Sequence, residues 1–208
     1  MTAPCRAFAI VPAAGQSRRM GQPKLLLPWS DGTIIEATLA AWKASFVAAV
    51  VVVVRSDDAE LAAICRRSGA EVVVPAVAPP HMRDSVQQAL NFIAEEYHPV
   101  AEDVWMLAPA DMPQLSPAIV NHLLAAHSPD APAILTPTLA GRRGHPVLFP
   151  WPLAEQVPQL PADRGINAMH WQNPTREVPC EQLGVDREAF CDVDTPEQYD
   201  EARKHPPR

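Results

Sequence analysis

Short runs of apolar residues, separated by segments with helical spacing, limit most strongly what this chain can fold into. Runs without polar alternation are typical of parallel strands that helices cover on both faces. We therefore expect strands at Ala7–Val11, Val47–Val54, Glu71–Val74, Val104–Leu107, Ala133–Thr136, Pro146–Phe149 and Ala189–Val193.

The intervening segments place apolar residues at helical intervals and predict helices at Thr33–Lys43, Ala59–Arg67, Asp84–Glu96, Pro117–Ala126, Ala162–Trp171 and Pro196–Lys204. Strands that alternate with helices in this way favour right-handed βαβ units. The sequence therefore predicts an α/β fold of three layers, α/β/α, around a doubly wound, mostly parallel, Rossmann-like sheet. Residues 150–162 contain four prolines and predict a loop or lid, and residues 205–208 predict a frayed tail.

Length, charge and cysteine use narrow the class of protein. A chain of 208 residues favours one domain spanning residues 1–208. A net charge of −7 argues against a nucleic-acid partner, and the apolar runs are too short to span a membrane. The N-terminus does not resemble a signal peptide. The widely spaced cysteines predict reduced thiols and a cytoplasmic location: Cys5, Cys65, Cys180 and Cys191.

The turn after the first predicted strand concentrates positive charge. Residues 11–28 read VPAAGQSRRMGQPKLLLP, and Arg18, Arg19 and Lys24 all precede the first acidic residue, Asp31. The spacing fits neither a Walker A loop nor a GxGxxG loop. Gly15 nevertheless allows close approach of a ligand to the backbone, and Arg19 and Lys24 can bind phosphate oxygens. The pattern predicts an anion site, with a solvated basic loop as the alternative.

Carboxylates stand at two other predicted strand ends. Asp111 follows Val104–Leu107, and it would face the basic turn if these strands flank the point where strand order reverses. Ser116 with Pro117 is the better start for the next helix, which leaves Asp111 free to bind Mg²⁺. Thr195-Pro196-Glu197-Gln198 is typical of a capping box, but the two aspartates before it, Asp192 and Asp194, need another explanation.

Four motifs in order resemble the MobA/MocA-like nucleotidyltransferases of the molybdenum-cofactor type. They are AAGQSRRMGQPKLLLP at 13–28, LAPADMP at 107–113, GHPVLF at 144–149 and DVDTPEQYDEA at 192–202. The resemblance implies the fold of the nucleotide-diphospho-sugar transferases and a Mg²⁺-dependent transfer of a nucleoside monophosphate. The expected substrates are an NTP, CTP in the first place, and a small phosphorylated acceptor, molybdopterin carrying molybdenum. A molybdoenzyme or its maturation factor is an expected partner.

The resemblance also assigns residues. Catalysis is expected from Arg19, Lys24 and Asp111, and Mg²⁺ binding from Asp111, Asp192 and Asp194. Nucleotide binding is expected from Ala13, Ala14, Gly15, Ser17, Arg19, Lys24, Arg83 and Ser85. The last two lie in RDSVQQAL, which is similar to a segment of methylerythritol phosphate cytidylyltransferases that lies near the cytidine. Capping of a helix by Asp84 or Ser85 is the alternative for this segment.

Acceptor binding is expected from Arg143, Gly144, His145 and Asp163, although Asn167 stands where the family has arginine. A solvated turn is the alternative for residues 142–146. Within the class, cytidylyl transfer to methylerythritol phosphate or to another sugar or polyol phosphate remains open. Two other classes remain: a nucleotide-sugar glycosyltransferase, although Pro109 replaces the first acid of its usual DxD, and a non-catalytic cofactor-delivery protein.

Overall fold

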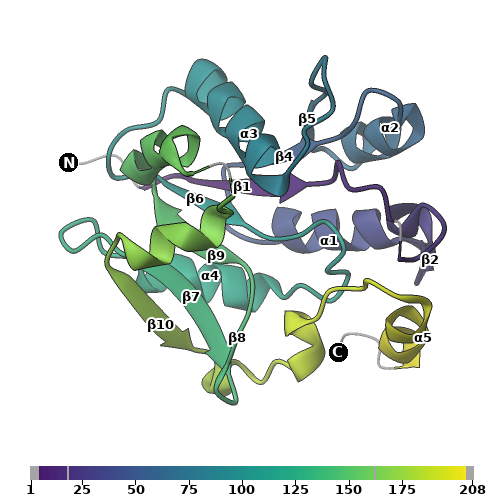
Figure 1. Cartoon of the computed structure of the whole chain (residues 1–208). Coiled ribbons are helices and arrows are strands. Elements are labelled where there is room, and N and C mark those ends of the chain that lie inside the picture. The colour runs from purple at the N-terminus through teal and green to yellow at the C-terminus, as the bar shows by residue number, and fades with distance from the viewer. Residues whose placement is uncertain (1–4, 18, 162, 205–208) are drawn as a thin grey trace.

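A central sheet covered by helices on both faces organises the computed structural model, which describes residues 5–17, 19–161 and 163–204 (Figure 1). Within these residues, the sheet runs in the order β10-β7-β9-β6-β1-β4-β5, with β8 paired to β7. Its strands are β1 (Ala7–Pro12), β4 (Ala49–Val53), β5 (Glu71–Val73), β6 (Val104–Leu107), β7 (Ile134–Leu139), β8 (Arg142–Arg143), β9 (Val147–Pro150) and β10 (Thr175–Pro179).

The helices are α1 (Ile34–Lys43), α2 (Ala59–Arg67), α3 (Met82–Tyr97), α4 (Pro117–Ala126) and α5 (Pro196–Lys204). A small hairpin of β2 (Pro28–Trp29) and β3 (Gly32–Thr33) precedes α1. The remaining elements are 3₁₀ helices: η1 (Lys24–Leu26), η2 (Trp151–Gln159), η3 (Ile166–Trp171), η4 (Glu181–Leu183) and η5 (Arg187–Phe190). Among the described residues, no helix combines the length and the apolar character needed to cross a bilayer.

The sheet confirms the predicted mostly parallel, doubly wound topology. β1 pairs in parallel with both β4 and β6, and β4 pairs in parallel with β5, whereas β9 is antiparallel to β6 and β7. From β1 the chain first builds β4 and β5 on one side and then crosses to β6 on the other. Strand order therefore reverses between β1 and β6, and their carboxyl ends are where ligands bind in such sheets.

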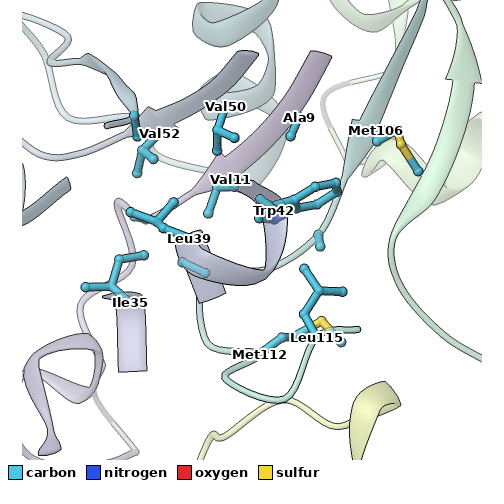
Figure 2. Close-up of a cluster of buried hydrophobic side chains, with 14 of the residues drawn as sticks. Ala9, Val11, Ile35, Leu39, Trp42, Val50, Val52, Met106, Met112 and Leu115 are labelled. Atoms are coloured by element: carbon cyan, nitrogen blue, oxygen red, sulfur yellow. The ribbon is translucent and has the colours of Figure 1, made fainter. Parts of the chain in front are cut away.

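Alternate side chains of β1 pack into two separate hydrophobic cores, one on each face of the sheet. Ala9 and Val11 pack with the buried side of α1, as Figure 2 shows, whereas Phe8 and Ile10 pack with α3 on the opposite face. α1 begins cleanly because Thr33 and Glu36 form a capping box, in which the Thr33 N–H donates to the Glu36 carboxylate over 2.9 Å. The two cores confirm the predicted three layers.

The strand predicted at Ala189–Val193 is wrong. This segment forms η5 and then irregular extended chain, because its hydrogen bonds go elsewhere. The Ala189 N–H donates to the Asp186 carbonyl, and the Val193 N–H donates to the Asp111 carbonyl over 2.9 Å. The short apolar run therefore anchors a loop against the sheet instead of adding a strand.

The segment after β9 also differs from expectation. Residues 151–159 form η2 instead of a loop, because the prolines are compatible with its short turns and Val157 is fully buried in the α3 core. The helix predicted at Ala162–Trp171 is reduced to η3, and Ala162 lies outside the described residues, as does the predicted tail, His205–Arg208. β10 was missed because, as an exposed edge strand, it buries only Val178 and lacks an apolar run.

Candidate functional site

Residues 13–24, which we call the signature turn, leave the carboxyl end of β1. The Ala13 N–H donates to the Val53 carbonyl over 2.9 Å, so the chain first continues alongside β4. Ser17 then shapes the turn: its carbonyl accepts from the Gly21 N–H over 3.2 Å, and its Oγ accepts from the Lys24 N–H over 3.3 Å. Gly21 has a φ of 71°, a conformation that glycine adopts without strain. The turn thereby fixes the backbone from which Lys24 projects.

Asp111 stands four residues beyond the end of β6 and is buried, with 7% of its surface exposed. The preceding carbonyl, of Ala110, accepts a hydrogen bond from the Thr38 hydroxyl of α1 over 3.1 Å. Ser116 occupies the N-cap position of α4 with Pro117 in its first turn, as predicted. Asp111 is therefore not the helix cap, and its carboxylate faces the signature turn.

Asp192 and Asp194 lie in the loop before α5, and this loop brings them close to Asp111. Val193 is buried between them and is tied to Asp111 by the backbone bond described above. The predicted capping box is present: Gln198 Oε1 accepts from the Asp194 and Thr195 N–H groups over 2.7 and 3.0 Å. Tyr199 then donates its hydroxyl to the Pro28 carbonyl over 2.5 Å, which ties α5 to the segment after the signature turn.

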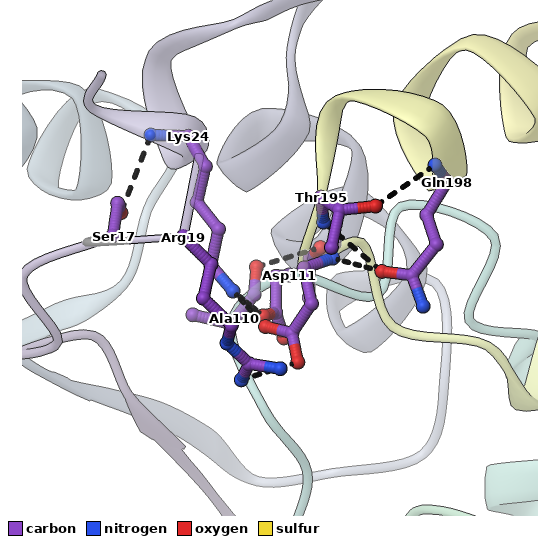
Figure 3. Close-up of polar contacts among 9 residues, drawn as sticks. Ser17, Arg19, Lys24, Ala110, Asp111, Thr195 and Gln198 are labelled. Carbon is purple, nitrogen blue, oxygen red and sulfur yellow. Dashed lines mark hydrogen bonds and ion pairs between the residues drawn. The ribbon is translucent and has the colours of Figure 1, made fainter. Parts of the chain in front are cut away.

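Basic and acidic side chains converge between these three segments (Figure 3). The Lys24 ammonium contacts a carboxylate oxygen of Asp111 and lies 2.7 Å from Oδ1 of Asp194. Arg19 Nη2 lies 2.7 Å from Oδ2 of the same Asp194. Asp111, Asp192 and Asp194, which we call the acidic cluster, each offer an oxygen, and these oxygens all lie within 4.8 Å of one another. Arg18 lies outside the described residues.

Electrostatics distinguish the two aspartates that contact Lys24. Burial raises the pKa of Asp111 above its ordinary value, although the bond and charge of Lys24 act to lower it. For Asp194, burial acts to raise the pKa, but Lys24 and Arg19 together hold it below its ordinary value. Burial acts to lower the pKa of Lys24, and its bonds to both aspartates raise it instead. Of the two aspartates that contact Lys24, Asp111 is thus the one whose burial outweighs the effect of Lys24 on its pKa.

The acidic cluster suits a hard divalent cation. Oδ1 of Asp111 is buried and has no hydrogen-bond partner among the described residues. An ionised carboxylate oxygen can only accept, so a buried one without a donor is costly unless a cation is bound. One or two carboxylates, completed by water and substrate phosphates, are the ligands that Mg²⁺ prefers. The donor set and the unpaired oxygen therefore fit such an ion.

A cavity of about 370 Å³ lies beside this cluster at the carboxyl ends of β1 and β6. We call it the strand-end cavity. Its lining includes predicted site residues from all three segments, together with Ser85 of α3: Ala13, Ala14, Gly15, Ser17, Arg19, Lys24, Ser85, Asp111, Asp192 and Asp194. Pro79 and Pro80 also line it and were missed, since prolines before the α3 segment carry no chemical signal of their own.

The predicted nucleotide residue Arg83 does not line this cavity. Its Nη1 instead donates to the carbonyls of Leu160 and Pro161 over 3.1 and 2.7 Å, so that it holds these two residues against the start of α3. The capping alternative for this segment is confirmed for Asp84, whose carboxylate accepts from the His81 N–H over 3.0 Å. Ser85 is buried and faces the cavity from the same helix.

The predicted acceptor residues lie outside the lining of the strand-end cavity, within the described part of the chain. Arg143 is exposed and pairs with Glu177 of β10 at 2.7 Å. Nδ1 of His145 lies 3.3 Å from the carbonyl of Leu107, at the end of β6. Burial lowers the pKa of His145, while the nearby charges of the acidic cluster act to raise it. Asp163 is exposed and its nearest charged partner is its neighbour Arg164, at 3.7 Å.

A larger cavity of about 790 Å³ lies away from this site, near the start of β1. Its described lining contains Glu102, Asp130 and several prolines but no lysine or arginine. An anion would meet only like charge there, so size does not decide where a phosphate chain can bind. The strand-end cavity is the one that combines two basic side chains with a candidate cation site.

Comparison with known proteins matches residues 9–176 to the model of the MobA-like NTP transferase domain. The chain is 26% identical to the molybdenum cofactor cytidylyltransferase of Escherichia coli K12 over 196 residues, 94% of each chain. It is 30% identical over 200 residues, again 94% of each, to the probable molybdenum cofactor guanylyltransferase of Bacillus anthracis CDC 684 / NRRL 3495. The crystal structure of Rv0371c from Mycobacterium tuberculosis H37Rv matches with a TM-score of 0.79 and 28% identity, over 96% of this chain and 98% of that one.

Proposed function

Since this chain belongs to the MobA-like NTP transferase family and is a nucleotidyltransferase, we propose that it transfers CMP from CTP to the phosphate of molybdopterin carrying molybdenum. An oxygen of the acceptor phosphate attacks the α-phosphorus of CTP, and the bond between that phosphorus and the oxygen bridging to the β-phosphate breaks. Pyrophosphate leaves and a new phosphoanhydride remains. The acceptor is proposed from relatives that are named as acting on molybdenum cofactor.

The chain's own residues contribute positioning and charge. Gly15 allows the triphosphate to approach the backbone of the signature turn, and Arg19 and Lys24 bind the departing pyrophosphate. The acidic cluster would hold Mg²⁺, which supplies charge stabilisation to the transferring phosphoryl group. An acceptor phosphate is already anionic, so this mechanism requires neither a nucleophilic side chain nor a strong base. The convergence of Lys24, Asp111 and Asp194 on the strand-end cavity is the observation that carries the proposal.

We propose CTP as the donor because the end of the strand-end cavity formed by α3 presents a buried hydroxyl that can bind the edge of a base. Ser85 is buried there, and its hydroxyl can both donate to and accept from a base edge. Pro79 and Pro80 line the same cavity and offer apolar surface beside Ser85. GTP is the alternative donor, since relatives with either specificity are similar to this chain.

We also propose a cytoplasmic location, because the four cysteines are free thiols in the structure.

The test is a panel of CTP, GTP, UTP and ATP, each with Mg²⁺ and molybdenum cofactor, with pyrophosphate release as the signal. We expect release with CTP, and we expect Lys24→Ala or Asp111→Ala to lower kcat/KM at least about 100-fold. Lys43→Ala is the matched control, because the Lys43 ammonium lies on the surface, outside the lining of the strand-end cavity, and donates to the Gly69 carbonyl. Turnover near the wild-type rate in a correctly folded Asp111→Ala variant would contradict the mechanism. Turnover with GTP and with none of the other three nucleotides would show that GTP, and not CTP, is the donor.

A further inference from the structure

The Lys24 ammonium lies between two members of the acidic cluster. It contacts Asp111 and is 2.7 Å from Asp194, and only 15% of its side chain is exposed. These are oxygens of the same carboxylates that would bind the divalent ion. A metal ion bound to them would lie close to the Lys24 ammonium, and like charges in a half-buried site repel strongly. A metal ion therefore binds tightly at the acidic cluster only after Lys24 has left it.

We propose that Lys24 is an internal cation that occupies the acidic cluster until a metal–nucleotide complex displaces it. The inference rests on the proposed metal-dependent nucleotidyl transfer and concerns how that site is controlled. It assigns Lys24 two alternating sets of partners: the aspartates before the substrate binds, and the phosphates of the nucleotide afterwards.

Arg19, the second basic residue described at the site, cannot fill the same role. Arg19 contacts only Asp194 and its side chain is 72% exposed, so water screens this ion pair. Among the residues that the structure describes, Lys24 is the basic side chain that contacts the buried Asp111, and it bridges Asp111 to Asp194. Removing Lys24 therefore leaves Asp111 without its basic partner and Asp194 with Arg19, whereas removing Arg19 leaves both carboxylates in contact with Lys24.

The local structure allows the exchange without movement of the backbone. Lys24 starts η1, and its N–H is fixed by Ser17, so the flexible side chain can turn about a stationary anchor. Lys24 also lines the strand-end cavity, so a triphosphate bound there offers the ammonium new oxygen partners. The metal then gains the carboxylates and the lysine gains the phosphates in the same step.

This exchange predicts strong positive coupling between metal and nucleotide. Either one alone meets an obstacle: the metal meets the Lys24 ammonium, and the triphosphate meets the uncompensated carboxylates that Lys24 would leave behind. Coupling between two ligands is reciprocal, so each should raise the affinity for the other by the same factor. The protein would therefore avoid binding bare metal ions and take them up together with the nucleotide.

The test measures Mn²⁺ binding to the nucleotide-free protein by electron paramagnetic resonance of the unbound ion. Lys24→Met keeps the length of the side chain and removes its charge. We expect Lys24→Met to bind Mn²⁺ about tenfold or more tightly than wild type, since a competing cation is gone. With a non-hydrolysable CTP analogue present, wild type should bind Mn²⁺ more tightly than Lys24→Met, because the variant lacks a contact with the phosphates. Lys43→Met removes the same charge from the far surface and should leave both affinities unchanged.

The outcomes separate this inference from the proposed function. Equal Mn²⁺ affinity in wild type and in Lys24→Met, without nucleotide, overturns the displacement while leaving a metal-dependent enzyme intact. Adding Asp111→Asn to Lys24→Met should abolish the gained affinity. If it does not, the ion binds elsewhere and the metal site of the proposed function is wrong as well. Thermal melts verify folding, and Lys24→Gln replaces Lys24→Met if the latter does not fold.

Discussion

Gly144→Ala should disturb both stability and the acidic cluster, because the ring of Phe190 occupies the space that a side chain would need. An added Cβ at Gly144 would lie 1.7 Å from Cδ1 and 2.4 Å from Cε1 of Phe190, whereas ordinary contact begins at 3.4 Å. The ring must therefore retreat by about 1.7 Å, or the β8–β9 turn must shift. Overpacking of this kind costs roughly 1–3 kcal/mol of unfolding free energy.

The displacement should reach the site, since Phe190 ends η5 only two residues before Asp192. The assay is denaturant unfolding of Gly144→Ala, Phe190→Ala and the double variant, together with Mn²⁺ affinity. Because Phe190→Ala removes the clash, the double variant should be more stable than the sum of the two single effects by at least about 1 kcal/mol. Gly165→Ala is the control: its φ is −89°, nothing lies within 4 Å of its added Cβ, and it should change stability by less than about 0.5 kcal/mol. Additive effects of Gly144→Ala and Phe190→Ala would refute the reasoning.

Three further predictions concern other parts of the chain. Asp103 is buried, and its carboxylate accepts hydrogen bonds from Arg6 and from the Val100 N–H. Asp103→Ala should therefore lower the free energy of unfolding by about 3 kcal/mol. An unchanged midpoint of denaturant unfolding would contradict a stabilising role for the Arg6–Asp103 ion pair. Burial acts to raise the pKa of Asp103, but Arg6 and the backbone donors hold it below its ordinary value. The pair should therefore contribute its full stabilisation above about pH 4 and lose this contribution as the pH falls through the lowered pKa. Plots of melting temperature against pH for wild type and Asp103→Ala should accordingly converge at acid pH. Tyr199→Phe removes the bond to the Pro28 carbonyl and should raise the KM for Mg²⁺ while kcat changes little; equal KM values would show that α5 does not position Asp194. Burial raises the pKa of Cys65 to about 12, so a thiol reagent at pH 8 should label the exposed Cys191 first and Cys65 only after unfolding.

The features that the sequence predicted well are those with a strong local cause. The apolar run of β1 has to be covered on both faces, and the structure divides Ala9 and Phe8 between two cores. The basic turn and Asp111 were predicted to face one crevice on the condition that their strands flank the point where strand order reverses. The observed sheet order meets this condition at β1 and β6, and Lys24 does contact Asp111.

The features that the sequence did not predict depend on contacts between distant segments. The run at Ala189–Val193 has strand-like residues, but the carbonyl of Asp111, 82 positions earlier, takes the N–H of Val193 that a strand neighbour would have used. Arg83 has the charge of a phosphate ligand, yet its guanidinium donates to the carbonyls of Leu160, Pro161 and Arg164. Neither partner can be identified from residue type or spacing. The predicted roles of Arg143, Gly144, His145 and Asp163 toward an acceptor stay predictions.

Calorimetric titration with a non-hydrolysable CTP analogue, with and without Mg²⁺, tests most directly whether the signature turn and the acidic cluster hold one metal–nucleotide complex. Mg²⁺ should tighten binding to the wild-type protein at least about tenfold, and Asp111→Asn should remove this gain while keeping the fold. If Asp111→Asn retains the full Mg²⁺ dependence, the metal does not bind at the cluster that Lys24 contacts, and the account of the site is wrong.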